Sequence, residues 1–268
     1  MGRLAQIASM RRSIIILLST WVSAGLLSAE PLPITVGDGT INGDRFEPYT
    51  NRWEYSIKPP GKDVVKIGIW SDEMVAATVD GHAAYVRKQI AGSYKTGKST
   101  VTVNTFDART LAPLRREWID RNPANFTRIS FAGKALAVER FAAGPQPGPN
   151  APPPAPIATS AEIQLNASVF DYHGGMWGMI LAGAPLRVGF EGSFQTLDEF
   201  NPTISTVTFK VVRQEEVTAG PGKKVQAYVV EADSAKGGHL VFWITPEAPY
   251  VIRLVFTAGP GEWTYEML

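Results

Sequence analysis

Residues 206–211 read TVTFKV, and this short stretch decides the fold class. The apolar side chains Val207, Phe209 and Val211 alternate with two threonines and a lysine. Successive side chains of a β-strand point to opposite faces of a sheet, so an apolar residue at every second position places all the apolar groups on one face. The stretch therefore predicts a strand with one buried face and one face in water.

The same alternation recurs on both sides of this stretch. Alternating or β-rich runs occupy residues 53–57, 62–70, 101–105, 126–131, 136–141, 225–231, 240–244 and 251–256. Turn signals rich in glycine and proline separate many of them, at residues 59–61, 219–222, 236–238 and 259–261. Strands this close together favour antiparallel meanders, because a parallel crossover needs a dozen or more residues.

One helix is predicted, over residues 168–181. Ser168 can cap its start, and Pro185 follows its end. The residues at helical spacing are Val169, Tyr172, Met176, Ile180 and Leu181. Three glycines within the segment each disfavour a helix by about 1 kcal/mol relative to alanine, so the helix needs tertiary packing. Residues 71–89 fit a turn of helix and strands equally well, and the pattern leaves both open.

Together these patterns predict a mainly β fold. We expect a strongly curved antiparallel sheet or half-barrel, with one short helix against its concave face, in a single domain over residues 30–268. Seven prolines lie in residues 144–156. They are typical of a linker between two domains or of a long loop within one. We predict a loop, because neither half alone has enough strands for a complete core.

Residues 1–29 are typical of a secretory signal peptide. Their only charges are Arg3, Arg11 and Arg12, an apolar stretch follows, and small residues precede Glu30. We predict cleavage after Ala29, with Ala24 as the alternative, and therefore a periplasmic protein. A retained membrane anchor is the competing interpretation, although polar residues and a glycine interrupt the stretch. The arginine pair fits general secretion better than the twin-arginine route.

The composition excludes several classes of protein. Lys and Arg total 26 and Asp and Glu total 25, without a basic stripe, which argues against nucleic-acid binding. The chain has no cysteine, so it has neither disulfides nor a lipid-attachment cysteine. Beyond the first 29 residues no apolar stretch is long enough to span a membrane.

Residues 92–99, GSYKTGKS, match the pattern of a phosphate-binding P-loop. That loop must connect a strand to a helix whose N-terminus holds the phosphates. Residues 100–105 instead alternate as a strand, so we interpret the segment as a polar hairpin turn.

Other motifs give no catalytic or metal site. Asp80 and His82, and likewise Asp171 and His173, form Asp-x-His pairs, but a metal site needs three or four converging ligands. We interpret these residues as turn and surface residues. The acidic pair at 215–216 is interpreted as a solvated turn, and the chain lacks a G-x-S-x-G motif. We therefore predict no cofactor, no metal and no catalytic residues.

Aromatic residues are the remaining functional lead. Most must belong to the core. A curved sheet with a helix on its concave side can nevertheless enclose an apolar cavity, with the glycine-containing helix as a lid. The predicted ligand-binding residues are Trp53, Tyr55, Trp70, Tyr172, Met176, Trp177 and Phe242.

Several short motifs carry a family resemblance. They are Phe106 to Pro113, Phe170-Asp171, Pro185-Leu186, Gly189, Glu216-Val217, Tyr228 to Glu231, Trp243-Ile244 and the end of the chain at residues 265–268. In these the chain resembles a family of exported bacterial proteins of unknown function. In general form it is similar to periplasmic lipoprotein carriers, which are curved, incomplete β-barrels with helices over the opening. The resemblance implies Gram-negative export and a β-rich fold, and it supplies no catalytic residues. The proline-rich stretch and the glycine-rich helix depart from the pattern.

We predict a periplasmic, non-catalytic module that binds a hydrophobic or amphiphilic ligand, such as a lipid, or an envelope protein partner. Two alternatives stay open. One is a hydrolase acting on envelope polymers, which requires carboxylates or histidines that converge in a cleft. The other is a structural or assembly protein, whose cavity is filled by side chains.

Overall fold

The stretch that decides the fold class lies in the long strand β11 (Ile204–Ala219). Val207, Phe209 and Val211 are buried there, and the side chains between them are exposed, as the alternation predicts. The computed structural model of the protein describes residues 30–121, 124–142, 157–171, 176–197, 203–220, 222–235, 238–258 and 261–268. The predicted signal peptide and the proline-rich residues 144–156 lie outside these ranges.

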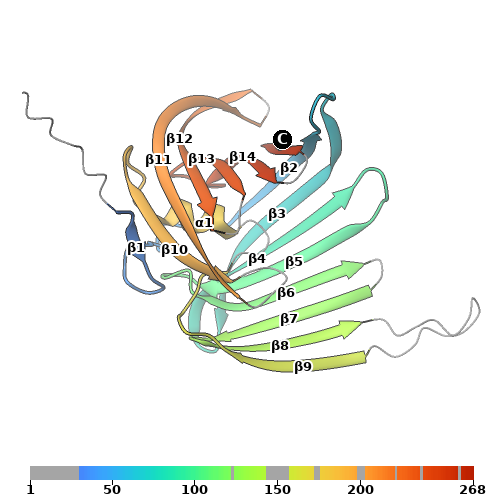
Figure 1. The fold of residues 1–268 in the computed structure, drawn as a ribbon, viewed down its shortest axis with the longest axis vertical. Coiled ribbons are helices and arrows are strands. Elements are labelled where there is room, and N and C mark those ends of the chain that lie inside the picture. The colour runs from blue at the N-terminus through green and yellow to red at the C-terminus, as the bar shows by residue number, and fades with distance from the viewer. Residues whose placement is uncertain are drawn as a thin grey trace, which may run out of the picture. The chain divides into compact units, whose positions relative to one another are not determined.

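Fifteen strands of the described residues form one sheet within residues 31–268 (Figure 1). Besides β11 they are β1 (Leu32–Ile34), β2 (Tyr49–Lys58), β3 (Val65–Val79), β4 (His82–Ser93), β5 (Ser99–Asp107), β6 (Pro113–Arg121), β7 (Ala124–Ala132), β8 (Ala135–Ala142), β9 (Ile157–Gln164), β10 (Glu191–Leu197), β12 (Lys223–Ser234), β13 (His239–Ile244), β14 (Val251–Ala258) and β15 (Gly261–Met267).

The order across the sheet is β1-β10-β11-β12-β13-β14-β15-β2-β3-β4-β5-β6-β7-β8-β9. All neighbours run antiparallel except β1 and β10, which are parallel. The edges β1 and β9 are not paired with each other, so the sheet is open. These observations confirm the predicted mainly β, antiparallel and incompletely closed fold.

The helix α1 (Met176–Gly183) confirms a short helix but corrects its start. Ser168 does not cap it, because the chain is still extended at Phe170. The Phe170 N–H donates to the Gln195 carbonyl at 2.9 Å, and the Phe170 carbonyl accepts from the Leu197 N–H at 3.2 Å. Those backbone groups are bonded to β10 and are not available to a helix. Residues 172–175 lie outside the described ranges.

All eight residues of α1 are buried, and the helix packs against β13 and β14 on the concave face. Gly178 permits this close approach. A Cβ atom at Gly178 would lie 2.6 Å from the Val251 Cγ2 atom and 3.5 Å from the Phe242 ring. Gly178 lowers the intrinsic helix propensity, but it also allows the helix to pack closely on β13 and β14. That tertiary packing stabilises the helix and compensates for the low propensity.

The two faces of β11 to β15 belong to different hydrophobic clusters. The concave cluster includes Phe209, Phe242 and the residues of α1, and the cluster on the other face includes Ala219 and Trp243. A β-bulge between Val211 and Arg213 lets β11 contribute to both, because one extra residue exchanges the faces.

The acidic pair at 215–216 lies within β11, not in a turn as predicted. Glu215 accepts a hydrogen bond from the Trp243 indole at 2.5 Å and pairs with Arg213 at 2.7 Å. The Arg213 hydrogen bond, followed by the one from Trp243, lowers the pKa of Glu215. These residues are therefore part of the structure of the sheet.

Two motifs form the tight turns that their sequences predict. Residues 92–99 connect β4 to β5 as a hairpin, with the Ser93 N–H bonded to the Lys98 carbonyl at 3.0 Å and Gly97 at a positive φ of 63°. A strand follows, so this is not a phosphate-binding loop. Asp80 and Gly81 form the turn between β3 and β4, and residues 71–89 are strands on either side of it.

Candidate ligand-binding site

Polar side chains line part of the concave face, where the alternation places buried residues. Asp72 in β3 is directly opposite Gln89 in β4, and Arg87 in β4 is opposite Asn104 in β5. Asn104 is in turn opposite Arg116 in β6. All five are at most 4% exposed. Buried polar groups need partners, so this row of residues marks a place with a specific structural or functional role.

Arg87 and Asp72 form a buried bidentate ion pair. The Arg87 Nε atom donates to Asp72 Oδ1 at 2.9 Å, and Nη2 donates to Oδ2 at 2.5 Å. Burial by itself would lower the pKa of Arg87, but the adjacent Asp72 carboxylate outweighs burial and raises it. The Arg87 guanidinium therefore keeps its proton, and its charge is compensated by the carboxylate that it contacts through two hydrogen bonds.

Two neighbours hold this ion pair in place. The Tyr49 hydroxyl donates to Asp72 Oδ2 at 3.2 Å, and burial raises the pKa of Tyr49, so the hydroxyl keeps its proton. The Arg87 Nη1 atom lies 3.8 Å from the Met176 sulfur at the start of α1. The ion pair thus links β3, β4 and the helix.

A second buried ion pair connects the sheet to the segment that precedes α1. Arg116 Nη1 donates to Asp171 Oδ1 at 2.6 Å, and both side chains are at most 5% exposed. Asp171 is therefore buried and paired, not a turn or surface residue as predicted. It follows Phe170, which is bonded to β10. The pair therefore fastens this segment across the concave face of β6.

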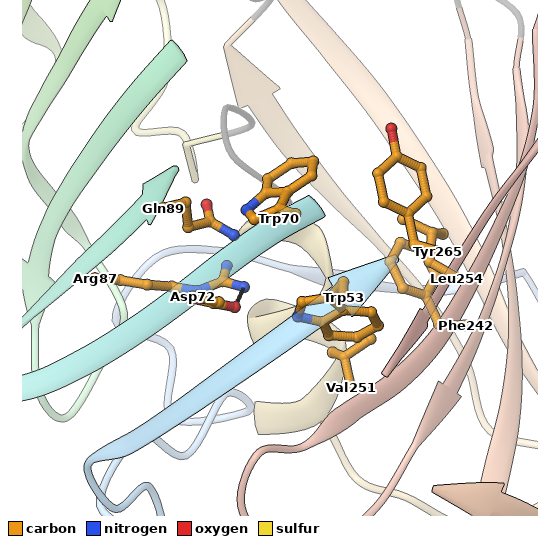
Figure 2. Close-up of a pocket in the computed structure, with 9 residues that line it drawn as sticks. All are labelled: Trp53, Trp70, Asp72, Arg87, Gln89, Phe242, Val251, Leu254 and Tyr265. Carbon is orange, nitrogen blue, oxygen red and sulfur yellow. Dashed lines mark hydrogen bonds and ion pairs between the residues drawn. The ribbon is translucent and has the colours of Figure 1, made fainter. Parts of the chain in front are cut away.

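A cavity of about 40 Å³ lies between the polar row and the hydrophobic core. Figure 2 shows Asp72, Arg87 and Gln89 on one side of it and Trp53, Phe242 and Val251 on the other. The remaining lining residues, Trp70, Leu254 and Tyr265, are only partly buried. The cavity therefore has a polar wall, an apolar wall and a partly exposed rim.

Two polar atoms in the lining lack a hydrogen-bond partner among the described residues. They are the Trp70 Nε1 atom, which is a donor, and the Gln89 Oε1 atom, which is an acceptor. Both atoms are enclosed, and Gln89 as a whole is 3% exposed. A buried polar group without a partner costs about 1–3 kcal/mol, so a molecule in the cavity that bonds to both gains that free energy.

The rim of the cavity is aromatic. The Tyr265 ring stacks on Tyr55 with centroids 5.6 Å apart and meets Trp70 edge-on at 5.4 Å. The Tyr55 hydroxyl donates to the Gly92 carbonyl at 3.2 Å. This arrangement gives an apolar surface next to the opening.

The structure brings together four of the seven predicted ligand-binding residues. Trp53, Trp70 and Phe242 line the cavity, and Tyr55 supports its rim. Met176 does not line the cavity, but its sulfur lies 3.8 Å from Arg87 Nη1. Trp177 is elsewhere in the core, edge-on to Phe194 at 6.2 Å, and Tyr172 lies outside the described residues.

Sequence reasoning missed the polar wall. The signal is present in β4, where Arg87 and Gln89 follow the buried Tyr85 at every second position and share its face. A polar residue at a position that the alternation assigns to the core indicates a specific role. Residues 71–89 fit both helix and strand, so the shared face was not identified.

The described residues contain no group of three or more histidine, aspartate and glutamate side chains that fits a metal ion. His239 pairs with Asp233 at 2.8 Å on the surface, away from the cavity lining. None of the helices in the described part of the chain is long and apolar enough to cross a membrane.

Fold and site together define a mainly β protein with an open, curved antiparallel sheet around a small cavity of mixed polarity. Residues 97–267 match the model of a family described as protein of unknown function, DUF3108, and the chain belongs to that family. A solved structure, a β-barrel-like protein of the domain of unknown function DUF1849 from Brucella abortus, is 10% identical, with a TM-score of 0.44. That similarity covers 82% of this chain and 95% of the other. No curated protein matches the chain.

Proposed function

We propose that the protein is a periplasmic, non-catalytic binding protein for an amphiphilic ligand. One observation carries the proposal: the cavity places an apolar wall opposite a polar wall, and one polar atom of Gln89 in that wall and one of Trp70 at the rim lack a partner among the described residues. A water molecule needs roughly 10–15 Å³ of such space, so this cavity takes about three waters or one small chemical group. The ligand therefore inserts one end, and the rest of it lies over the aromatic rim.

The absence of catalysis is part of the proposal and rests on the state of the charged groups. Asp72 and Arg87 satisfy each other through two hydrogen bonds, so the carboxylate in the cavity wall is not poised as a general base. The proposal that the protein is exported rests on residues 1–29, whose basic and apolar parts are typical of a signal peptide.

Native mass spectrometry of protein purified from a bacterial periplasm tests both parts of the proposal. We expect the mass of residues 30–268 together with an amphiphile that organic extraction releases. Leu254→Trp narrows the opening and should remove most of the bound molecule. Thr257→Trp, on the same strand but exposed, should retain it. Protein that carries no amphiphile and takes up no added fatty alcohol, fatty acid or phospholipid would refute ligand binding.

An envelope protein partner is the second candidate, and the open edge of the sheet favours it. All residues of β9 but one are exposed, and β8 is its only neighbour among the described strands. An exposed edge offers unpaired backbone groups to another strand. A photo-crosslinker at Thr159 in β9 should capture an envelope protein, whereas one at Thr206 in β11, which is paired on both sides, should not. Equal capture at both positions would argue against an edge-specific partner.

A further inference from the structure

We propose that the cavity selects an amphiphile with a neutral head group that both donates and accepts hydrogen bonds, such as a hydroxyl or a primary amide. This inference rests on the proposed ligand-binding function and names the chemistry of the ligand's inserted end. Three observations carry it: the unpartnered atoms, the neutral ion pair and the position of the rim.

The unpartnered atoms require a head group with both hydrogen-bonding roles. The Trp70 indole can only donate, and the Gln89 Oε1 atom accepts. A hydroxyl accepts from the first and donates to the second. An ionised carboxylate only accepts, and an ammonium only donates, so each would leave one of the two atoms without a partner.

The ion pair disfavours a charged head group of either sign. Asp72 already occupies Arg87 through two hydrogen bonds, so the wall offers no uncompensated cation to an anionic ligand. The Asp72 carboxylate is likewise compensated and offers little to a cation. A charged group that enters this site loses its hydration and gains at most one of the two hydrogen bonds and no opposite charge, which is costly.

The position of the rim determines which end of the ligand enters the cavity first. Asp72, Arg87 and Gln89 are buried, whereas Trp70, Leu254 and Tyr265 are partly exposed. Figure 2 shows the Tyr265 ring beside Leu254, with its hydroxyl pointing away from the polar wall. The head group therefore enters first, and the apolar chain leaves over Leu254 and the aromatic rings.

A set of ligands with one chain and different head groups tests the inference. 1-Decanol, decanamide, decanoate and decylammonium are titrated at pH 7, with binding followed by tryptophan fluorescence and native mass spectrometry. We expect decanol and decanamide to bind at least about tenfold more tightly than either charged ligand, because each charged ligand leaves a buried atom unpaired.

Two substitutions locate the head group. Gln89→Met removes the acceptor and should weaken decanol about five- to tenfold while leaving decanoate, which cannot donate to that acceptor, little changed. Trp70→Phe removes the indole N–H and should weaken decanol by a similar factor. Gln214→Met, at an exposed glutamine in β11, should leave all affinities unchanged. Because the two substitutions are independent, one variant that fails to fold still leaves the other as a test.

The outcomes separate this inference from the proposed function. Binding of decanoate or decylammonium as tight as that of decanol would overturn neutral selectivity, while ligand binding would stand. Tight decanol binding that neither Gln89→Met nor Trp70→Phe weakens would also overturn it. Binding of none of the four ligands would overturn both and leave the cavity to water alone.

Discussion

Replacing Arg87 by methionine is expected to lower the free energy of unfolding by about 3–5 kcal/mol, because it leaves the buried Asp72 carboxylate without its cation. Asp72 is 1% exposed, and the small cavity beside it holds at most a few waters, which do not supply the lost positive charge. Tyr49 still donates to it, but one neutral hydrogen bond does not balance a buried charge. Urea unfolding followed by tryptophan fluorescence measures the loss.

The double variant Arg87→Met, Asp72→Leu separates the cost of an unpaired charge from the loss of the pair. Replacing both partners of a buried ion pair by apolar residues is often neutral or stabilising, so the double variant should recover most of the lost free energy. Lys224→Met is the control. Lys224 pairs with Glu216 at 2.6 Å, but its side chain is 69% exposed, and such pairs contribute about 0–1 kcal/mol. A loss from Arg87→Met as small as that from Lys224→Met would contradict the role assigned to the buried pair.

The sequence predicted the fold class because period-two alternation follows directly from burial of one face of a strand. It holds in β11, where every second residue from Val207 to Val211 is buried. Alternation alone did not identify the bulge after Val211, which turns Ala219 to the other face. A single inserted residue leaves a locally normal pattern on each side, so a short window does not reveal it.

The start of the helix was wrong for a related reason. Val169 and Tyr172 lie at helical spacing with Met176, but the backbone of Phe170 is bonded to β10 in the described structure. That contact joins residues about 25 positions apart in the chain, and local spacing does not encode it. The extended segment ahead of the helix is therefore set by tertiary contacts.

The sequence predicted some of the residues at the candidate site and missed others. Large aromatic residues in alternating runs identified Trp53, Trp70 and Phe242 in the lining, because such residues are buried in most sheets. Val251, Leu254 and Tyr265, which complete the apolar wall and the rim, were not predicted. The polar wall needs the register between strands, which brings Asp72 next to Gln89 and Arg87 next to Asn104. Register depends on turns and bulges along the whole hairpin. Once the register is known, Asp72, Arg87 and Gln89 can be placed together as one wall of the cavity.

The second large effect on stability is expected at Phe242, which lies in the apolar wall opposite the polar row. Phe242 is 1% exposed, lines the cavity and lies against Gly178 of α1, so it belongs at once to the core and to the candidate site. Phe242→Ala should lower the free energy of unfolding by about 3–5 kcal/mol, through lost burial and through the enlarged cavity. Val241→Ala is the matched control. It is adjacent in β13 but faces the other cluster, where it is only partly buried, so its loss should be smaller.

The enlarged cavity should also change what the protein binds. The space left by the ring adjoins Trp53 and Val251, so it is largely apolar and should accept a small apolar molecule such as benzene. A ligand that binds only the folded state stabilises it, by about 2.7 kcal/mol at a hundredfold excess over its dissociation constant. Benzene should therefore raise the Tm of Phe242→Ala but not that of Val241→Ala or the unmodified protein. If Phe242→Ala loses stability without any response to benzene, the core has collapsed into the space, and Phe242 acts in packing alone.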